Sequence, residues 1–416
     1  MSYISFLFRN FRFLSYSFSL NVFLGLGQTY YISLFNADLQ AELSLSHGEL
    51  AAIYGAATIT SSILLLFVGH LLDTVDLRWF SSVATLLVGG ACYAIANIDS
   101  TLMLFAAVCG LRFSALGLWG LTSATAPARY FDNDRGKATS IGSAGMAMGY
   151  AILPFIGAWL ISSFGWREAW IIAALFVMFV VLPLVHIQLW RHGERHRRYV
   201  EMRDASLVIQ DSPQVRQWTV IEVLKDRQFY LVQPALLFVP SIVFNIQFHQ
   251  LHLVEIKGWG LDSFTAAYVI FAVTSLVANI SGGFLVDRYS TRSVLSWYLL
   301  PLVPALAAVW LFSHPVVIIA LMVGTGASFG LSLVVYNTLW AEVYGTKSLG
   351  AVRAINACIN PIVASIAMAG TGWLIDEGIN IDTQCLAFLG VLLVSGFVSR
   401  NAYVNRDPLT PSLTPK

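Results

Sequence analysis

The chain has 416 residues, of which 57% are hydrophobic and only 11% are charged, and its mean hydropathy is +0.70. Soluble globular chains carry roughly 25% charged residues, so this composition excludes an ordinary soluble domain. The net charge of +1 argues against a nucleic-acid partner. The four cysteines all fall in apolar runs without a Cys-x-x-Cys pair, and they indicate neither a disulfide framework nor a metal site: Cys92, Cys109, Cys358 and Cys385.

Apolar runs recur along the chain, and a helix that spans a bilayer needs about 20 such residues. The first six predicted spans lie near residues 13–36, 50–69, 79–97, 101–126, 138–162 and 169–190. The second six lie near residues 229–251, 263–285, 294–312, 316–340, 349–374 and 383–399. The first run is too long for a signal peptide and lacks a small-x-small cleavage site. The sequence therefore predicts an all-α integral membrane protein with twelve transmembrane helices.

A long polar segment, residues 191–228, separates the two sets of spans. It predicts a central linker between an N-terminal half, residues 1–190, and a C-terminal half, residues 229–400. Residues 401–416 form a tail. The end of the linker, Val220–Phe229, has the pattern of an amphipathic segment that leads into the seventh span.

The basic residues predict the orientation in the membrane. The predicted outer loops contain Arg167 and Lys257, Arg112 lies within a span, and the rest of the 24 Lys and Arg residues fall on the side of both termini. Cytoplasmic loops carry the excess of positive charge, so both termini and the linker are expected in the cytoplasm. The expected location is the plasma membrane, or the inner membrane if the source is bacterial.

A loop motif occurs twice at one constant sequence offset. Its first copy follows the second span at Gly69, Asp73 and Arg78. The second copy follows the eighth span at Gly283, Asp287 and Arg292. The same offset relates further pairs: Gly110 and Gly324, Tyr130 and Tyr344, Gly136 and Gly350, Trp159 and Trp373. This repetition indicates a tandem duplication.

With this loop motif, twelve spans and a basic linker, the chain resembles the major facilitator superfamily of transporters. The resemblance implies two six-helix pseudo-symmetric halves, and secondary active transport by alternating access. The motif residues, with Arg288 in the second copy, would then take part in gating: Asp and Arg would bridge the halves on the cytoplasmic side in one conformation. In the first copy Thr74 replaces the family's basic residue, which predicts weaker gating control there.

The fifth span also resembles the family, in its Gly/Pro-rich pattern. Gly142, Gly145 and Gly149 share one helix face, and Pro154 follows them. Small residues let helices approach closely, and we expect this face either to pack across the seam between the halves or to serve helix packing alone.

Three connecting segments are similar to the monocarboxylate-porter and oxalate/formate-exchanger branch of the superfamily. They are residues 129–138, 165–170 and 218–229. The acidic-Gly signature of the animal monocarboxylate carriers is absent from the first span, and the eighth span has no Arg. The resemblance therefore favours small organic anions without identifying one.

Arg112 lies about 16 Å along the fourth span at 1.5 Å per residue, which places it near the middle of the bilayer. The predicted spans have no acidic residue at that depth. The repeat counterpart of Arg112 in the second half is Gly326, so the duplication does not require an Arg here. A cation in a water-filled cavity suits the anionic group of a substrate, which a guanidinium binds through two parallel hydrogen bonds. The alternative is a structural Arg held by carbonyl groups, tyrosines or water.

Polar residues on spans one, seven and ten are further candidates, because the resemblance places helices one, four, seven and ten around the cavity. The expected substrate-binding residues are Arg112, Gln28, Tyr31, Asn245, His249 and Tyr336. His249 and His252 are also candidates for proton coupling, because histidine titrates near neutral pH. Asn356 and Asn360 precede Pro361 and are expected to repair the backbone there, with a substrate contact as the alternative.

The expected function is thus the transport of a small, monocarboxylate-like organic anion, with a proton as a candidate coupling ion and the lipid bilayer as surroundings. The alternatives are an exporter of a neutral amphipath or sugar and a membrane sensor that does not transport. The sequence has no catalytic cluster at one depth, so no enzyme is expected. No cofactor or metal is expected, and the chain is expected to be a monomer.

Overall fold

The computed structural model describes residues 3–73, 75–131, 135–190, 193, 219–295, 297–344 and 349–401. Regular structure within these residues is helical. Most of the predicted linker, residues 191–228, and of the predicted tail, residues 401–416, lies outside the described residues.

The first half of the chain contains several interrupted helices. Its elements are α1 (Tyr3–Phe23), η1 (Leu24–Gly27), α2 (Thr29–Ile32), η2 (Ser33–Phe35), α3 (Asn36–Leu43), α4 (His47–Val68), η3 (Gly69–Asp73), α5 (Leu77–Ala96), α6 (Thr101–Leu111), η4 (Arg112–Trp119), α7 (Gly120–Tyr130), α8 (Arg135–Phe164), α9 (Trp166–Phe176), η5 (Val177–Val181) and α10 (Leu182–Gln188).

The second half begins with a short helix on the linker side. Its elements are α12 (Val220–Lys225), α13 (Arg227–Phe248), α14 (Gln250–Lys257), α15 (Leu261–Ala266), α16 (Tyr268–Tyr289), α17 (Thr291–Leu295), α18 (Leu302–Leu311), α19 (Val317–Tyr344), α20 (Leu349–Asp376) and α21 (Ile381–Asn401). A capping box of Thr219 and Glu222 starts α12, as that Thr-x-x-Glu pattern favours.

Each of the twelve predicted spans falls on one of these helices or on a run of them. In the part of the chain that the structure describes, ten helices are long and apolar enough to cross a membrane. The first predicted span is interrupted at Leu24–Gln28, and the ninth contains the shorter apolar helix α18. The all-α membrane fold is therefore confirmed, and the two less regular spans reflect local breaks in the helix.

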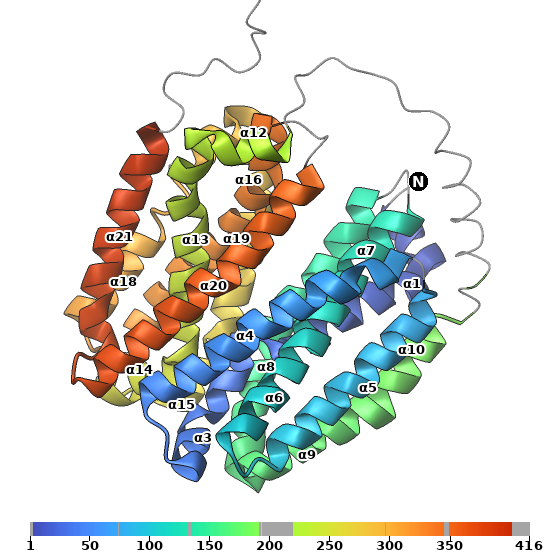
Figure 1. The fold of residues 1–416 in the computed structure, drawn as a ribbon, viewed down its shortest axis with the longest axis horizontal. Coiled ribbons are helices and arrows are strands. Elements are labelled where there is room, and N and C mark those ends of the chain that lie inside the picture. The colour runs from blue at the N-terminus through green and yellow to red at the C-terminus, as the bar shows by residue number, and fades with distance from the viewer. Residues whose placement is uncertain are drawn as a thin grey trace, which may run out of the picture.

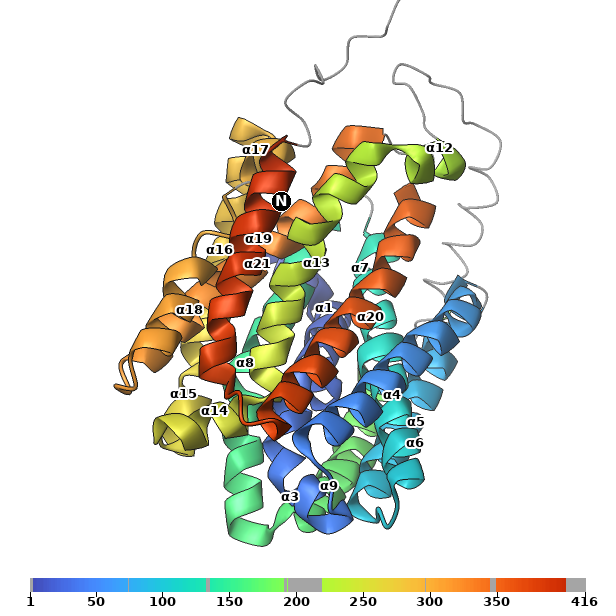
Figure 2. The same ribbon diagram turned by 60° about the vertical axis from the view of Figure 1, so that its left-hand side comes forward.

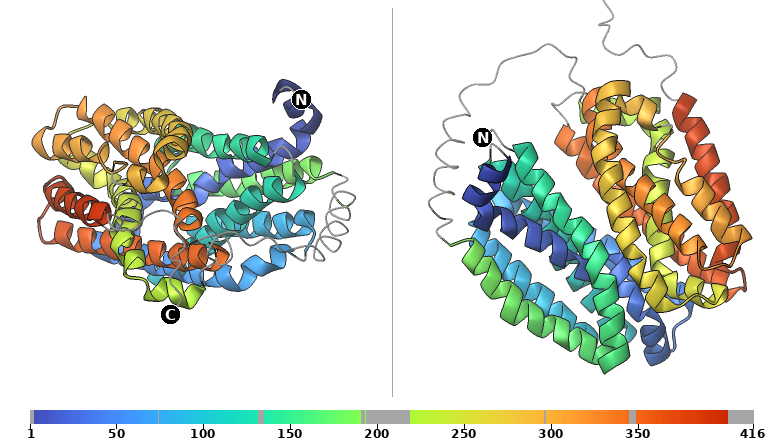
Figure 3. Two further views of the ribbon diagram at one scale, coloured as in Figure 1. Left: turned by 90° about the horizontal axis from the view of Figure 1, so that it is seen from above. Right: turned by 180° about the vertical axis from the view of Figure 1, so that it is seen from behind.

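The two halves form separate bundles that meet along a central seam (Figure 1). Their ribbons converge at the end that carries α3, α14 and α15, and they diverge toward the end that carries α7 and α12 (Figure 3). We call these the far end and the linker end. Helix α4 packs against α20 and α8 packs against α16, so each half contributes one long helix to each side of the seam (Figures 1 and 2).

One contact recurs in both halves and supports the internal duplication. A Cβ atom on Gly110 would lie 3.7 Å from the Cβ of Ala91, and one on Gly324 would lie 2.4 Å from the Cβ of Ala305. The two glycines are repeat counterparts, and so are the two alanines. The fourth and tenth spans thus meet the third and ninth through equivalent small residues.

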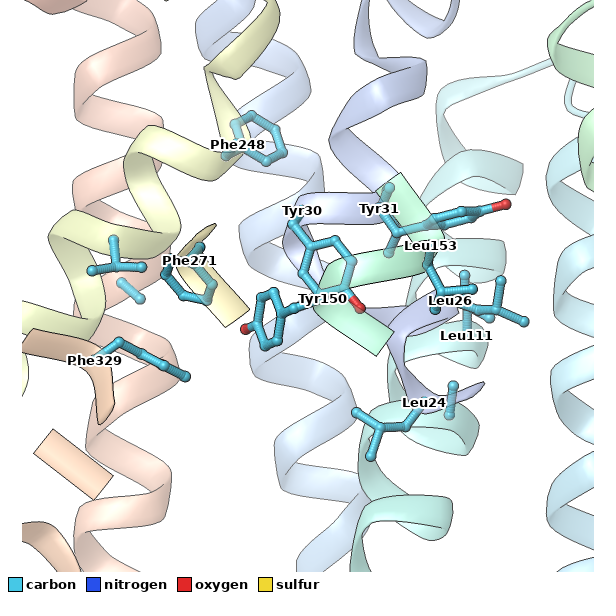
Figure 4. Packing of buried hydrophobic residues seen from close by; sticks show 14 of the residues in the cluster. Leu24, Leu26, Tyr30, Tyr31, Leu111, Tyr150, Leu153, Phe248, Phe271 and Phe329 are labelled. Carbon is cyan, nitrogen blue, oxygen red and sulfur yellow. The ribbon is translucent and has the colours of Figure 1, made fainter. Parts of the chain in front are cut away.

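Aromatic side chains join the two halves at the centre of the seam (Figure 4). The ring centroids of Tyr30 and Tyr150 lie 4.3 Å apart, those of Tyr150 and Phe271 lie 4.8 Å apart, and Phe271 continues to Phe329 at 5.8 Å. The first two residues belong to the N-terminal half and the last two to the C-terminal half. Aromatic pairs at such distances stabilise beyond the area that they bury.

The small-residue face of α8 packs within its own half. A Cβ atom on Gly145 would lie 2.2 Å from the carbonyl oxygen of Phe18, and one on Gly149 would lie 2.7 Å from that of Val22. Gly142 likewise faces Ser17. The glycines therefore serve close packing on α1, and the prediction that they line the seam is wrong. A helix face of small residues allows a neighbouring helix backbone to approach closely, and here that backbone belongs to α1.

Candidate functional site

A cavity of about 340 Å³ lies between the two halves, and both halves contribute to its lining. The polar lining residues are Gln28, Thr29, Thr58 and Arg112 from the N-terminal half, and Ser332, Tyr336 and Asn360 from the C-terminal half. Apolar surface comes from residues such as Phe244, Phe329 and Met368. Among the described residues that line the cavity, Arg112 is the only charged one.

Arg112 is buried and is held by neutral groups. Its Nη1 donates hydrogen bonds to the carbonyl oxygen of Gly27, at 3.2 Å, and to the hydroxyl of Tyr54. Its Cζ lies 5.0 Å from the centroid of the Tyr54 ring, and its Nε has no hydrogen-bond partner. Tyr54 in turn donates to Thr29. The guanidinium is thus positioned by one carbonyl group and one phenol, and these leave its charge uncompensated.

Two local breaks in helical structure create this arrangement. Gln28 has an extended backbone (φ −81°, ψ 152°), which interrupts the first span next to Gly27. Arg112 begins a π-helical segment, η4, in the fourth span. A Cβ atom on Gly27 would lie 2.9 Å from the Cβ of Ala115, so only glycine permits this approach. Interrupted spans and π-helical segments are frequent where membrane proteins bind ligands.

The cavity contains three of the six predicted substrate-binding residues: Arg112, Gln28 and Tyr336. The structure also adds Thr58 and Asn360 to its wall. The Oδ1 atom of Asn360 has no hydrogen-bond partner, and the position of this residue in the cavity wall matches the alternative of a substrate contact. The adjacent Pro361 was the sequence feature that could have identified Asn360 as a cavity residue.

Tyr31, Asn245 and His249 do not line the cavity. The ring of Tyr31 packs edge-on against Trp170, with centroids 5.6 Å apart. Asn245 donates to the hydroxyl oxygen of Thr371 at 2.8 Å, and the Nε2 of His249 lies 3.0 Å from the carbonyl oxygen of Met368. Because a carbonyl group only accepts, that Nε2 carries the proton.

The substrate-binding prediction for these three residues therefore does not match their placement. Helical spacing showed correctly that Asn245 and His249 share a face. That face of the seventh span meets α20, and the spacing contains no information about which neighbour it meets.

At the far end, α4 and α20 are in direct contact. The backbone N–H groups of His47 and Gly48 donate to the two carboxylate oxygens of Asp376, at 3.0 and 2.8 Å. The negative charge thus lies at the N-terminus of α4, where the helix dipole favours it. A Cβ atom on Gly48 would lie 1.9 Å from the ring of Trp373, and one on Gly372 would lie 2.6 Å from the carbonyl oxygen of His47. The two helices approach this closely because both positions are glycine.

Further hydrogen bonds join the halves near the far end. Ser33 Oγ donates to the carbonyl oxygen of Gln247 at 2.6 Å, and Asn36 Nδ2 donates to that of Phe248 at 2.8 Å. The side-chain amide of Gln250 donates to Ser33 Oγ at 2.8 Å. These bonds connect the segment after the break in the first span to the end of α13, and so they close the far end of the seam.

A second cavity, of about 600 Å³, lies in the seam between α8 and α16. Its wall includes Ser140 and Ser143 from α8, Ser275 and Asn279 from α16, and Asn337 from α19. These residues lie in the parts of their helices that extend toward the linker end. The seam is therefore tightly joined at the far end and hollowed toward the linker end.

The first copy of the loop motif forms its contacts within its own half. The side chain of Arg78 pairs with Asp76, with Nη2 and Oδ2 3.0 Å apart, and Asp76 also caps α5. Gly69 has ordinary contact with Leu121, at 3.6 Å from a Cβ position. The side chain of Asp73 lies outside the described residues.

The second copy behaves similarly. Arg292 lies 3.8 Å from Glu342 of α19, in the same half. Asp287 is exposed, and the guanidinium of Arg288 lies 5.5 Å from the ring centroid of Tyr289. No atom lies within 4 Å of a Cβ position on Gly283. In this conformation the ion pairs named for the described motif residues stay within one half.

Two helical bundles with a cavity between them, joined tightly at one end of the seam, are typical of membrane transporters built from two halves. The family model of the Major Facilitator Superfamily matches residues 17–368. The chain therefore belongs to the Major Facilitator Superfamily. It is a multi-pass membrane transporter of small molecules and not an enzyme.

Solved structures share this fold. The nucleoside transporter NupG superposes with a TM-score of 0.65 at 15% sequence identity, over 95% of this chain and 99% of that chain. A bacterial homologue of the human lysosomal transporter Spinster, in an inward-facing and occupied conformation, gives a TM-score of 0.63 at 14% identity, over 93% of this chain and 91% of that chain. At these identities the likeness concerns the fold alone. None of the curated proteins compared with the sequence matches it.

Proposed function

We propose that this transporter carries a small organic monoanion of the monocarboxylate class by alternating access. The linker end would face the cytoplasm, with both termini on that side, and the membrane would be the plasma membrane or a bacterial inner membrane. The observation that carries this proposal is the uncompensated charge of Arg112 in the wall of the central cavity.

The energetics of burial support a ligand role for Arg112. An Arg at the centre of a spanning helix costs about 2.5–3.5 kcal/mol even on the insertion scale that penalises it least. The neutral contacts with Gly27 and Tyr54 offset part of that cost but leave Nε without a partner. A carboxylate in the cavity would supply the missing charge and accept from the guanidinium through two oxygens.

A single cation favours a monoanion over a dianion. The other lining residues of the described chain are neutral, so a second carboxylate would lie against uncharged groups. Burying a charge without a partner is costly, and the dianion should therefore bind more weakly.

Coupling to protons rests on histidines near the far end. His252 lies beside His47 of the opposite half, with ring centroids 5.2 Å apart, so its charge would affect closure of the seam. The loop-motif charges would act in the opposite conformation, when the linker end closes and they can reach the other half. Asp287 is available for such a contact because it is exposed here.

The test is to measure ligand affinity and thermal stability on the same purified variants. Arg112→Lys keeps the charge and loses the planar fork, so carboxylate affinity should fall about tenfold. Arg112→Gln should lower it about a hundredfold or more, because it removes both hydrogen bonds to the carboxylate and each contributes about 1.5–3 kcal/mol. Arg167→Gln is the matched control: Arg167 pairs with Glu42 and donates to the carbonyl oxygen of Ala96, away from the cavity.

The control should change thermal stability and leave carboxylate affinity unchanged. Intact carboxylate binding by Arg112→Gln would overturn the anion proposal and favour an exporter of a neutral amphipath or sugar. Carboxylate binding without flux in proteoliposomes would instead identify a sensor that does not transport.

A further inference from the structure

The two walls of the central cavity differ in hydrogen-bonding character. The N-terminal half contributes the donors of Arg112 and the side-chain amide of Gln28, while the hydroxyl of Thr58 already donates to the carbonyl oxygen of Tyr54. The C-terminal half contributes no charged residue among the described residues of the lining.

The hydroxyl groups of the C-terminal wall also donate hydrogen bonds within the protein. Ser332 Oγ donates to the carbonyl oxygen of Phe329 at 2.7 Å, and the Tyr336 hydroxyl donates to that of Arg353 at 3.2 Å. A hydroxyl oxygen whose proton is engaged still has lone pairs that accept. Toward the cavity, both groups therefore act as acceptors.

Two prolines add backbone acceptors to the same wall. A proline inside a helix removes the hydrogen bond to the carbonyl group four residues earlier. Pro240 in α13 thereby releases the carbonyl of Leu236, and Pro361 in α20 releases that of Ala357. Each proline lines the cavity together with the residue whose carbonyl it releases. The released groups thus lie on the helix faces that border the cavity.

Asn360 completes this wall, because the residue lines the cavity and its buried Oδ1 has no hydrogen-bond partner. Unsatisfied buried acceptors are costly, since each loses its water without replacement. A ligand that brings a donor to this wall would satisfy at least one of them. A ligand that presents an apolar group or a further acceptor there would leave them unpaired.

We infer that the C-terminal wall is an acceptor subsite, and that the substrate is a carboxylate with a neutral hydrogen-bond donor, a hydroxyl or an amide N–H, at the end remote from the carboxylate. The inference rests on the proposed function for its carboxylate end. The inference that the substrate has a donor at its other end rests on Asn360, on the two released carbonyl groups and on the hydroxyl groups that already donate within the protein. Phe244 and Phe329, with centroids 6.0 Å apart, supply the apolar middle of the site.

The experiment compares three matched series of probes on the purified full-length protein. The first series is the ω-hydroxyalkanoates from butanoate to octanoate; the second is the corresponding ω-methoxyalkanoates; the third is the unsubstituted alkanoates. At the chain length that spans the cavity, the ω-hydroxy acid should bind about tenfold more tightly than its methoxy counterpart, as expected for one satisfied hydrogen bond. A neutral pair, an α,ω-diol and its dimethyl ether, is measured alongside.

Asn360→Leu tests the subsite directly, because it keeps the volume and removes the acceptor. It should abolish the preference for the hydroxy acid over its methoxy counterpart at every chain length. Asn337→Leu is the matched control. Asn337 is exposed on α19, and its side-chain amide donates to the carbonyl oxygen of Leu333; it lines the second cavity and not this one.

Equal affinity for hydroxy and methoxy acids at every length would overturn the inference and leave the anion proposal intact. If no alkanoate binds, the anion proposal fails. The affinities of the diol and of its dimethyl ether then test whether the C-terminal wall is an acceptor subsite. A preference for the diol that Asn360→Leu removes would uphold the acceptor wall, and no preference would overturn it.

Discussion

The two long contacts between the halves, α4 with α20 and α8 with α16, are related by the internal repeat but are packed differently. The α4–α20 contact is closed at the far end by Gly48, Gly372 and Asp376. The α8–α16 contact contains a cavity of about 600 Å³ toward the linker end. The duplication thus produced two equivalent helix pairs, and particular side chains made one of them the tighter.

The residues that close the far end of the α4–α20 contact are not repeated at the equivalent positions of α8. Gly372 corresponds to Ala158, and Asp376 corresponds to Ser162. An alanine cannot allow the backbone approach that Gly372 makes to His47, and a serine has no charge to place at a helix N-terminus. Symmetry of the scaffold therefore does not extend to the contacts that hold one conformation, and four groups of substitutions can test this.

Gly372→Val should have the largest effect. A Cβ atom at this position would lie 2.6 Å from the carbonyl oxygen of His47, and overpacking typically costs about 1–3 kcal/mol. The population closed at the far end should fall about tenfold or more, as measured by distances between spin labels on α3 and α21. Gly370→Val on the same helix is the control, because nothing lies within 4 Å of a Cβ position there. Equal distance distributions for the two variants would contradict this role of Gly372.

Asp376→Asn should have a smaller effect in the same direction. The amide of the new Asn side chain retains one oxygen that can accept from the N–H groups of His47 and Gly48, but it has no charge. A negative charge at an exposed helix N-terminus contributes about 0.3–1 kcal/mol. We expect up to about a fivefold loss of the closed population in the same spin-label measurement. The neighbouring exposed residue provides the control, Glu377→Gln. A change of equal size in that control would assign the effect to general electrostatics.

The loop motif should affect rate more than affinity. Asp287→Asn or Arg292→Ala would remove contacts that we propose for the conformation closed at the linker end. Exposed pairs contribute about 0.2–1 kcal/mol, so transport in proteoliposomes should change up to about fivefold with little change in substrate affinity. Asp73→Asn should be milder, because Thr74 replaces the basic residue in that copy. Wild-type rates in both variants of the second copy, at normal expression, would exclude the gating role.

The smallest effect is expected from His252→Gln, which tests the pH dependence of the far-end contact. Partial burial and the proximity of His47 lower the pKa of His252 from its usual value near 6.5, while Glu255 and Asp382 act in the opposite direction. Because the closed conformation lowers this pKa, closure releases protons, and the closed population should fall as the pH drops below about 6.5.

The His252→Gln variant should therefore show a flatter transport–pH profile between about pH 5 and 8. His249→Gln is the comparison variant, since the ring of His249 is held by the carbonyl oxygen of Met368. An unchanged profile in the double variant would remove these histidines from proton coupling.

The positions of the spans and of Arg112 were predictable because they depend on local or periodic properties. Apolar runs of sufficient length indicate spanning helices wherever they occur. The repeated Gly110 and Gly324 signalled a duplication that the structure reproduces as equivalent contacts. Depth along a helix follows from the rise per residue, so Arg112 could be placed near the centre before any packing was known.

Neighbours across the seam could not be predicted in this way. Periodicity shows that Asn245 and His249 share a helix face, and that Gly145 and Gly149 lie on a helix face made of small residues. It does not show that the first face meets α20 or that the second meets α1.

The sequence by itself predicted an all-α membrane protein with twelve spans, two halves and a cation at mid-depth, and ten helices of spanning length occur in the part of the chain that the structure describes. The tertiary structure alone decided which polar side chains reach the cavity, that Asn360 has an unpaired oxygen there, and that Asp376 caps a helix of the opposite half. Helix position depends on interactions close in sequence, whereas the contacts of a face depend on how the helices pack and on where each one is interrupted.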